Sequence, residues 1–186
     1  MRKQTYIVFA ILIFITSLGW SFLSPLLLSE ASSGETVTAP HPGFKAPVFN
    51  LQNGDGDLLT NDDFTGQPTL LFFWTSWCSV CKTVMPQLED VYRDYAPKGF
   101  EILAVNATTQ DSAPAAQAEF QSKGYTYPLL YDLNGSAGKA YDVRAFPTAV
   151  LIGPDGIIQE VTIGSGLTSG ALRAFLDDWL ESRGEE

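Results

Sequence analysis

Apolar residues from about Lys45 onward follow two patterns, short continuous or alternating runs and helically spaced positions. The runs predict strands at 49–51, 58–59, 69–74, 101–105, 129–131, 148–152 and 157–163. Helical spacing predicts helices after Cys81, at 113–123, at 137–141 and after Thr168, whose hydroxyl can cap the last helix. Strand–helix–strand followed by a hairpin and a helix predicts an α/β fold, with a mixed central sheet flanked by helices.

An uncharged apolar segment, Tyr6 to Leu28, precedes this pattern. As a helix rising about 1.5 Å per residue, it can cross a hydrocarbon core of about 30 Å. Arg2 and Lys3 before it predict that the N-terminus stays inside and the rest lies outside. We therefore predict a single-pass cell-membrane anchor over residues 1–28. The alternative is a signal peptide cleaved near Ser29–Ala31, but apolar regions of signal peptides usually have only about 7–15 residues.

Residues 29–44 are rich in Ser, Thr, Ala, Gly and Pro and lack apolar periodicity, which predicts a flexible tether. The folded domain is then predicted to span residues 45–186. An anchor and a signal peptide both place this domain on the extracytoplasmic side, where disulfides persist. The one histidine, His41, lies in the tether and is given no role.

Composition excludes several classes of protein. The chain has 186 residues, which is long enough for one domain with a buried core. Of these residues 45% are hydrophobic and 17% are charged, a composition too apolar for a disordered protein. Its formal charge of −10 argues against a nucleic acid partner, because there is no basic stripe to neutralise phosphates. Two cysteines and one histidine cannot supply the four ligands of a structural zinc site, and we predict no metal or cofactor.

The two cysteines, Cys78 and Cys81, lie where the predicted strand 69–74 runs into the following helix. We expect Cys78 at the N-cap or in the first turn, where unpaired backbone N–H groups and the helix dipole favour a thiolate. Such surroundings can lower the pKa of a cysteine into the range of about 3.5–7.5. Cys81, one turn later on the same face, can form a disulfide with Cys78. Half of a metal site shared with a partner and two inert core thiols are the alternatives.

Two motifs resemble the thioredoxin family. The sequence Trp77–Lys82 (Trp-Cys-Ser-Val-Cys-Lys), with Pro86 after it, resembles the active-site helix of that family. Phe146–Thr148 (Phe-Pro-Thr) resembles its cis-proline loop. The resemblance covers Lys45 to the C-terminus. It implies a thioredoxin-like three-layer fold, preceded here by the predicted transmembrane helix.

Within that family the chain is similar to the membrane-tethered TlpA/ResA-like branch. The similarity lies in the opening Ala46–Leu51 (Ala-Pro-Val-Phe-Asn-Leu) and in an extra segment between Asn106 and Tyr127. It implies an extracytoplasmic thiol–disulfide oxidoreductase that reduces protein substrates, for example apocytochrome c in cytochrome c maturation. A transmembrane thiol carrier would supply the electrons.

The resemblance also implies roles for the site residues. The Cys78 thiolate attacks a substrate disulfide, and Cys81 then resolves the mixed disulfide, which leaves the pair oxidised. Pro147 would be cis, so that Phe146 can offer its backbone to the substrate in strand-like pairing. Trp77 packs beside Cys78 and shields it. Cys78 and Cys81 are thus the predicted catalytic residues, and Trp77, Phe146 and Pro147 the predicted substrate-binding residues.

The chain departs from the family pattern at two positions. Phe72 stands where thioredoxin has a buried Asp, and Thr109 stands where ResA-like proteins have a Glu. No carboxylate is therefore expected to take the proton of Cys81, and burial should raise the pKa of that thiol. Resolution by Cys81 is then expected to depend on water or hydroxide. The Ser79-Val80 dipeptide matches neither thioredoxin nor DsbA, so the direction of exchange stays open.

Two other activities are alternatives. An oxidase that introduces disulfides would use the same dithiol in the opposite direction. A copper metallochaperone would use both thiolates as ligands, but it needs a partner histidine, and the predicted domain contains none. Thr75, three residues before Cys78, has the spacing of a peroxiredoxin threonine. Leu71 replaces the proline expected four residues earlier, which argues against peroxidase activity.

Overall fold

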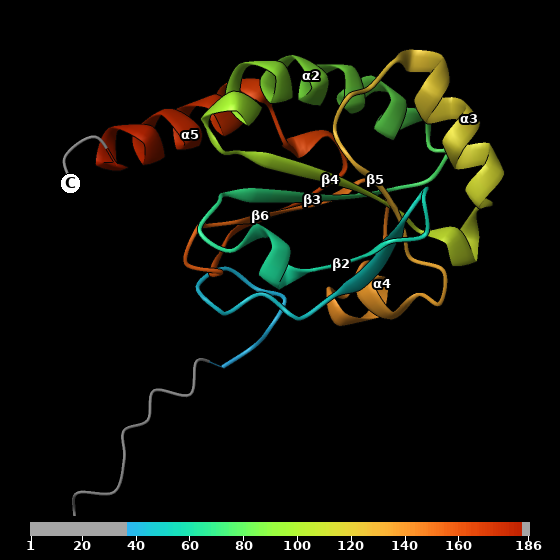
Figure 1. The fold of residues 1–186 in the computed structure, drawn as a ribbon, viewed down its shortest axis with the longest axis horizontal. Helices are drawn as coiled ribbons and strands as arrows, with labels where there is room; N and C mark the ends of the chain where they lie inside the picture. The colour runs from blue at the N-terminus through green and yellow to red at the C-terminus, as the bar shows by residue number, and fades with distance from the viewer. Residues whose placement is uncertain (1–36, 184–186) are drawn as a thin grey trace, which may run out of the picture. The chain divides into compact units, whose positions relative to one another are not determined.

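A seven-stranded mixed sheet runs through the structure, a computed structural model that describes residues 37–183 (Figure 1). The strands lie at the predicted runs: β1 (Asn50–Asn53), β2 (Leu58–Thr60), β3 (Thr69–Trp74), β4 (Glu101–Asn106), β5 (Leu129–Tyr131), β6 (Thr148–Ile152) and β7 (Ile158–Ile163). Their order is β2-β1-β5-β4-β3-β6-β7. β4 pairs in parallel with β3 and β5, and the other neighbours are antiparallel.

Helices cover both faces of this sheet. The α-helices are α2 (Ser79–Tyr95), α3 (Ala113–Lys123), α4 (Ser136–Ala140) and α5 (Ser169–Arg183). Short 3-10 turns are η1 (Asn61–Phe64), η2 (Ala96–Lys98), η3 (Thr108–Gln110) and η4 (Gly164–Gly166). Figure 1 shows α2, α3 and α5 over one face of the sheet and α4 on the other. The predicted three-layer α/β arrangement is confirmed.

The central strand β3 divides the core into two clusters. All six of its residues are buried. Because side chains alternate along a strand, Phe72 and Trp74 pack in the cluster under α2, whereas Leu71 and Phe73 pack in the cluster on the side of α4. Burial of each such side chain stabilises the fold by about 1.5–3 kcal/mol. Strand β3 therefore holds its carboxyl end, where α2 begins, in a fixed place.

Helix α2 presents one apolar stripe to the core, and its residues recur every three or four positions: Cys81, Val84, Leu88 and Val91. Pro86 lies inside the helix. Helix α5 also packs on this cluster, through Leu172 and Leu176. Its N-terminus is capped as predicted, because the Thr168 hydroxyl accepts the N–H of Ala171 at 3.2 Å.

The folded part begins before the predicted boundary at Lys45. Thr38 forms a bridge with Lys45, and Lys45 forms a second bridge with Ile157. The N–H of Gly43 donates to the carbonyl of Ile158 at 2.8 Å, and the N–H of Ile158 donates to Phe44 at 2.9 Å. The last residues of the predicted tether therefore pair with the hairpin β6–β7, and the folded unit starts at Val37.

The predicted membrane segment, residues 1–28, and the first part of the predicted tether lie outside the described residues. Between residues 37 and 183, no helix has both the length and the apolar character needed to cross a membrane.

A buried carboxylate joins the middle of α2 to the segment before β5. Glu89 is only 5% exposed. It accepts the N–H of Thr126 at 2.8 Å and the hydroxyl of the same residue at 2.9 Å. Arg93, one turn later, donates to Glu89 at 2.9 Å. Since a buried carboxylate without donors is costly, these bonds hold α2 at one distance from the sheet.

We predict that Glu89→Ala lowers the free energy of unfolding by about 2–3 kcal/mol, because the Thr126 N–H loses its acceptor. Arg93→Ala is the matched control. The Arg93 side chain is 62% exposed, and its loss should cost less than about 1 kcal/mol. Urea unfolding measures both values, and equal losses would show that the surface ion pair, not Thr126, accounts for the effect.

Candidate active site

Cys78 and Cys81 form a disulfide at the start of α2, with an S–S distance of 2.07 Å. After β3 ends at Trp74, the N–H of Cys78 donates to the carbonyl of Thr75 at 3.1 Å and closes a turn. Cys78 is the N-cap of α2, and its Sγ accepts the N–H of Cys81 at 3.1 Å. The predicted place of Cys78 at the helix N-terminus is confirmed.

The two sulfur atoms lie in different surroundings. Cys78 is 5% exposed and occupies the position of an N-cap acceptor. Negative charge at this place is favoured by the first-turn N–H groups and the helix dipole. Cys81 is fully buried in the core cluster under α2, where burial disfavours a charged thiolate. Reduction would therefore produce one activated thiol and one protected thiol.

Trp77 lies at the surface beside this pair and is 61% exposed. Its Nε1–H donates to the carbonyl of Gln110 at 2.9 Å. Its ring meets the ring of Phe146 edge to face, with centroids 6.0 Å apart. The structure thus brings together two of the predicted substrate-binding residues. Trp74, in contrast, is fully buried in the core.

The Phe146–Pro147 peptide bond is cis, as predicted. The carbonyl of Pro147 accepts the N–H of Gly164 at 2.8 Å, which joins this loop to the end of β7. Phe146 packs against the core cluster that contains Cys78 and Cys81. Its own N–H and carbonyl bond to no other residue among 37–183. That backbone is therefore available to an extended chain.

Neither departure from the family pattern brings a carboxylate to Cys81. Phe72 is fully buried in the same cluster as Cys81. The Thr109 methyl group lies 3.3 Å from the point where a side chain on Gly135 would begin. Thr109 also lines a cavity of about 200 Å³ together with Phe146. Within the described part of the chain, no hydrogen bond joins a carboxylate to Cys81.

The carboxylate that reaches the turn before Cys78 is Asp111, which no motif singled out. Its Oδ2 accepts the N–H of Ser76 at 2.5 Å, and its Oδ1 accepts the Ser76 hydroxyl at 2.7 Å. The side-chain amide of Asn106 donates to Oδ2 at 2.8 Å. The sequence signal that could have identified Asp111 was its position shortly after β4. Because β3 and β4 are parallel, their carboxyl ends meet at one edge of the sheet.

Partial burial by itself would raise the pKa of Asp111, but the hydrogen bonds from Ser76 and Asn106 outweigh it and lower the pKa. The folded state therefore favours the ionised carboxylate. The ionised Asp111 carboxylate therefore adds to the free energy of unfolding above the unfolded-state pKa of about 3.9. This contribution is lost as the pH falls below that value.

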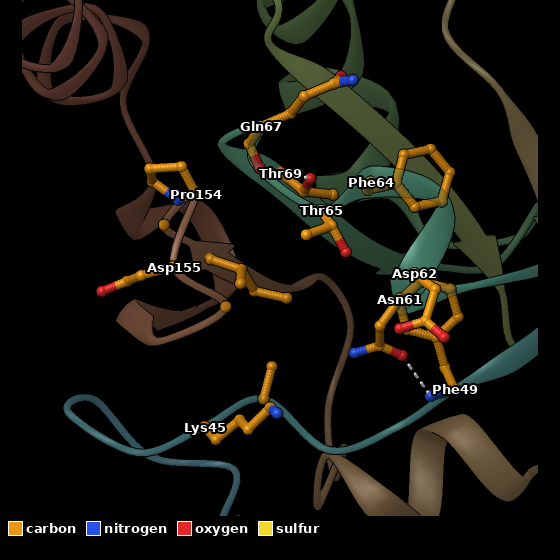
Figure 2. A pocket seen from close by; sticks show the side chains of 14 residues that line it. Lys45, Phe49, Asn61, Asp62, Phe64, Thr65, Gln67, Thr69, Pro154 and Asp155 are labelled. Carbon is orange, nitrogen blue, oxygen red and sulfur yellow. Dashed lines mark hydrogen bonds between the residues drawn. The ribbon is translucent and has the colours of Figure 1, made fainter. Parts of the chain in front are cut away.

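A second cavity, of about 160 Å³, lies at the opposite end of β3 (Figure 2). Lys45, Thr69 and Pro154 line it, and the Asn61 side chain accepts the N–H of Phe49 at 2.8 Å on its wall. Thr69 begins β3, whereas Cys78 follows its end, so this cavity is separate from the disulfide. Among residues 37–183, no three His, Cys, Asp or Glu side chains gather as a metal site.

The sequence profile of the AhpC/TSA family matches residues 42–161 of the chain. The thiol–disulfide oxidoreductase ResA of Bacillus subtilis (strain 168) is 30% identical over 167 residues, which are 90% of this chain and 88% of that protein. The thioredoxin-like protein YneN of the same organism is 32% identical over 136 residues, which are 73% of this chain and 78% of YneN.

The fold is similar to the crystal structure of a thiol:disulfide interchange protein, DsbE, from Chlorobium tepidum. The TM-score is 0.69 and the sequence identity 28%, and the match covers 75% of this chain and 98% of that one. The thioredoxin-like architecture implied by the motifs is thus confirmed.

We predict that a mixed disulfide on Cys78 is long-lived at neutral pH and that its resolution quickens as the pH rises. Cys81 is fully buried, so its thiolate forms only when water or hydroxide removes the proton. Stopped-flow measurement of attack and resolution across the pH range tests this. Fast resolution without pH dependence would mean that another group in the protein takes the proton.

Proposed function

The chain belongs to the AhpC/TSA family and is a thiol–disulfide oxidoreductase of the ResA and DsbE type, and from that premise we propose that it reduces disulfides of protein substrates outside the cytoplasm. One observation carries the proposal. The disulfide lies at the N-terminus of α2, beside the exposed Trp77 and the free backbone of Phe146.

Reduction transfers two electrons from the dithiol to the substrate. The Cys78 thiolate attacks one sulfur of the substrate disulfide, so that a Cys78–substrate bond forms and the other substrate sulfur leaves as a thiolate. Cys81 then loses its proton and attacks Cys78 Sγ. The Cys78–Cys81 bond forms and the second substrate thiol is released. The helix N-terminus favours the first step, because it stabilises the attacking thiolate.

Apolar surface around the disulfide is suited to an extended polypeptide. Trp77 is 61% exposed, Val80 in the first turn of α2 40%, and Ile163 62%. Ile163 is the register partner of Thr148, the residue after Pro147. We propose that a substrate chain pairs with the Phe146 backbone while its side chains contact this surface. Trp77, Phe146 and Pro147 are thus proposed as substrate-binding residues.

The proposed place of the domain is the outer side of the cell membrane, held by the apolar segment 1–28. The segment's length and the preceding Arg2 and Lys3 support this. A transmembrane thiol carrier is the proposed electron donor, and apocytochrome c a proposed substrate. The support for both is the similarity to ResA-like proteins.

For the reductase function we expect a Cys78–Cys81 reduction potential near that of thioredoxin, about −270 mV, in equilibrium with a thiol buffer. The reduced protein should also cleave the disulfides of insulin. Cys81→Ser should accumulate a mixed disulfide, whereas Cys78→Ser, the matched control, should form none. A potential near that of DsbA, about −120 mV, would identify an oxidase instead.

The membrane location predicts where protease cuts. Protease added to intact cells should release a fragment that begins before Val37, because the predicted tether is outside the membrane. The fragment should be absent from untreated medium. Domain found in the untreated medium with Ser32 at its N-terminus would show that the apolar segment is a cleaved signal peptide.

A further inference from the structure

The turn that precedes Cys78 is held by the segment that follows β4. Ser76 and Trp77 are the central residues of this turn, which the Cys78 N–H closes on Thr75. Asp111 accepts both the N–H of Ser76, at 2.5 Å, and its hydroxyl, at 2.7 Å. The preceding residue, Gln110, accepts the Trp77 Nε1–H at 2.9 Å. Both central residues of the turn are therefore hydrogen-bonded to the adjacent residues Gln110 and Asp111.

Asp111 is itself held by a strand of the core. Asn106, the last residue of β4, is fully buried and donates its side-chain amide to Asp111 at 2.8 Å. The Asn106 side-chain oxygen in turn accepts the Thr108 hydroxyl at 3.1 Å. In the parallel register, Asn106 lies opposite Trp74 of β3. The Asp111 carboxylate thus connects the buried end of β4 to the Ser76–Trp77 turn that leads into Cys78.

From these contacts we propose that Asp111 is a positioning residue for thiol–disulfide exchange, which holds the Ser76–Trp77 turn so that the sulfur of Cys78 lies at the N-terminus of α2. This inference rests on the proposed function only in that Cys78 attacks a substrate disulfide. The placement of the Cys78 sulfur is argued from the geometry alone. At that position Cys78 Sγ accepts the N–H of Cys81. A loosened turn would let the sulfur leave this donor and the helix dipole, and a smaller fraction of thiolate would form.

The charge of Asp111 acts in the opposite direction. A negative charge near a thiolate disfavours it, so removal of the charge without movement of the sulfur would make Cys78 more reactive. Two ion pairs lie on neighbouring elements: Lys82 of α2 with Glu119 of α3 at 3.2 Å, and Arg144 with Asp142 at 2.9 Å. Lys139 of α4 and the buried Asp132 line the cavity beside Gln110 and Phe146 and form no ion pair among residues 37–183. Loss of the Asp111 carboxylate therefore makes Cys78 less reactive if positioning dominates and more reactive if the charge dominates.

The test is the rate at which iodoacetamide alkylates Cys78 in the reduced full-length protein, measured across the pH range. With Asp111→Asn, an NH₂ group replaces one of the two acceptor oxygens, and the bonds from Ser76 and Asn106 lose the strength that the carboxylate charge gives them. We expect alkylation at neutral pH to become about three- to tenfold slower, and its rise to shift to higher pH, as the thiolate fraction falls.

Asp63→Asn is the matched control. Asp63 also accepts the N–H and the hydroxyl of a single residue, Thr60, at 2.7 and 3.2 Å, but it lies in η1, before β3. Its replacement should leave the alkylation profile unchanged. Ser76→Ala removes one bond to Asp111 and keeps the charge, so it should slow alkylation in the same direction by a smaller factor. Ser76→Ala also provides the test of the proposal if Asp111→Asn does not fold.

Combination of Ser76→Ala with Asp111→Asn should slow alkylation by less than the product of the two single effects, because both act through one contact. Unchanged or faster alkylation in either single variant, or equal slowing in Asp63→Asn, would overturn the proposal. Insulin reduction by the wild-type protein is a separate readout. If it fails while Asp111→Asn still slows alkylation, the proposed function is wrong and the positioning role stands.

Discussion

The candidate site depends on the register of β3 with its two neighbours. Trp74, at the end of β3, lies opposite Asn106 of the parallel strand β4, and Phe73 lies opposite Thr148 at the start of the antiparallel strand β6. Three connections therefore meet at one edge of the sheet. They are the turn into α2, the segment 107–111 after β4, and the Phe146–Pro147 loop before β6. A shift of this register would separate them, even if each segment kept its own conformation.

The redox chemistry follows from placing one sulfur at a helix end and the other in the core. The N-terminus of α2 stabilises a thiolate on Cys78 and so favours the reduced form, because a disulfide carries no charge. Full burial of Cys81 opposes ionisation of the second thiol. Both effects act on the reduction potential of the pair. The same Cys-x-x-Cys geometry thus supports reductases and oxidases in related proteins.

Acidic side chains hold several connections of this acidic protein by accepting backbone N–H groups. Asp111 accepts from Ser76, and Glu89 accepts from Thr126. Asp132, only 2% exposed, accepts from Gly138 at 2.8 Å in the first turn of α4. Such charge-assisted bonds are roughly twice as strong as neutral ones. Part of the negative charge therefore has a structural role in loops around the sheet.

The sequence by itself determined the elements and the dithiol. The apolar run of β3, the helical spacing in α2 and the cysteine pair between them are local patterns, readable because periodicity reflects which face is buried. Tertiary structure decided the contacts across the site. Ser76 and Asp111 are 35 residues apart, and no motif in either segment records the pairing. The η3 turn brings Thr109 against Gly135 and leaves Asp111 to bond Ser76. Only the folded structure decides whether Thr109 or Asp111 reaches the active-site turn, because a loop has no periodicity from which the directions of its side chains could be inferred.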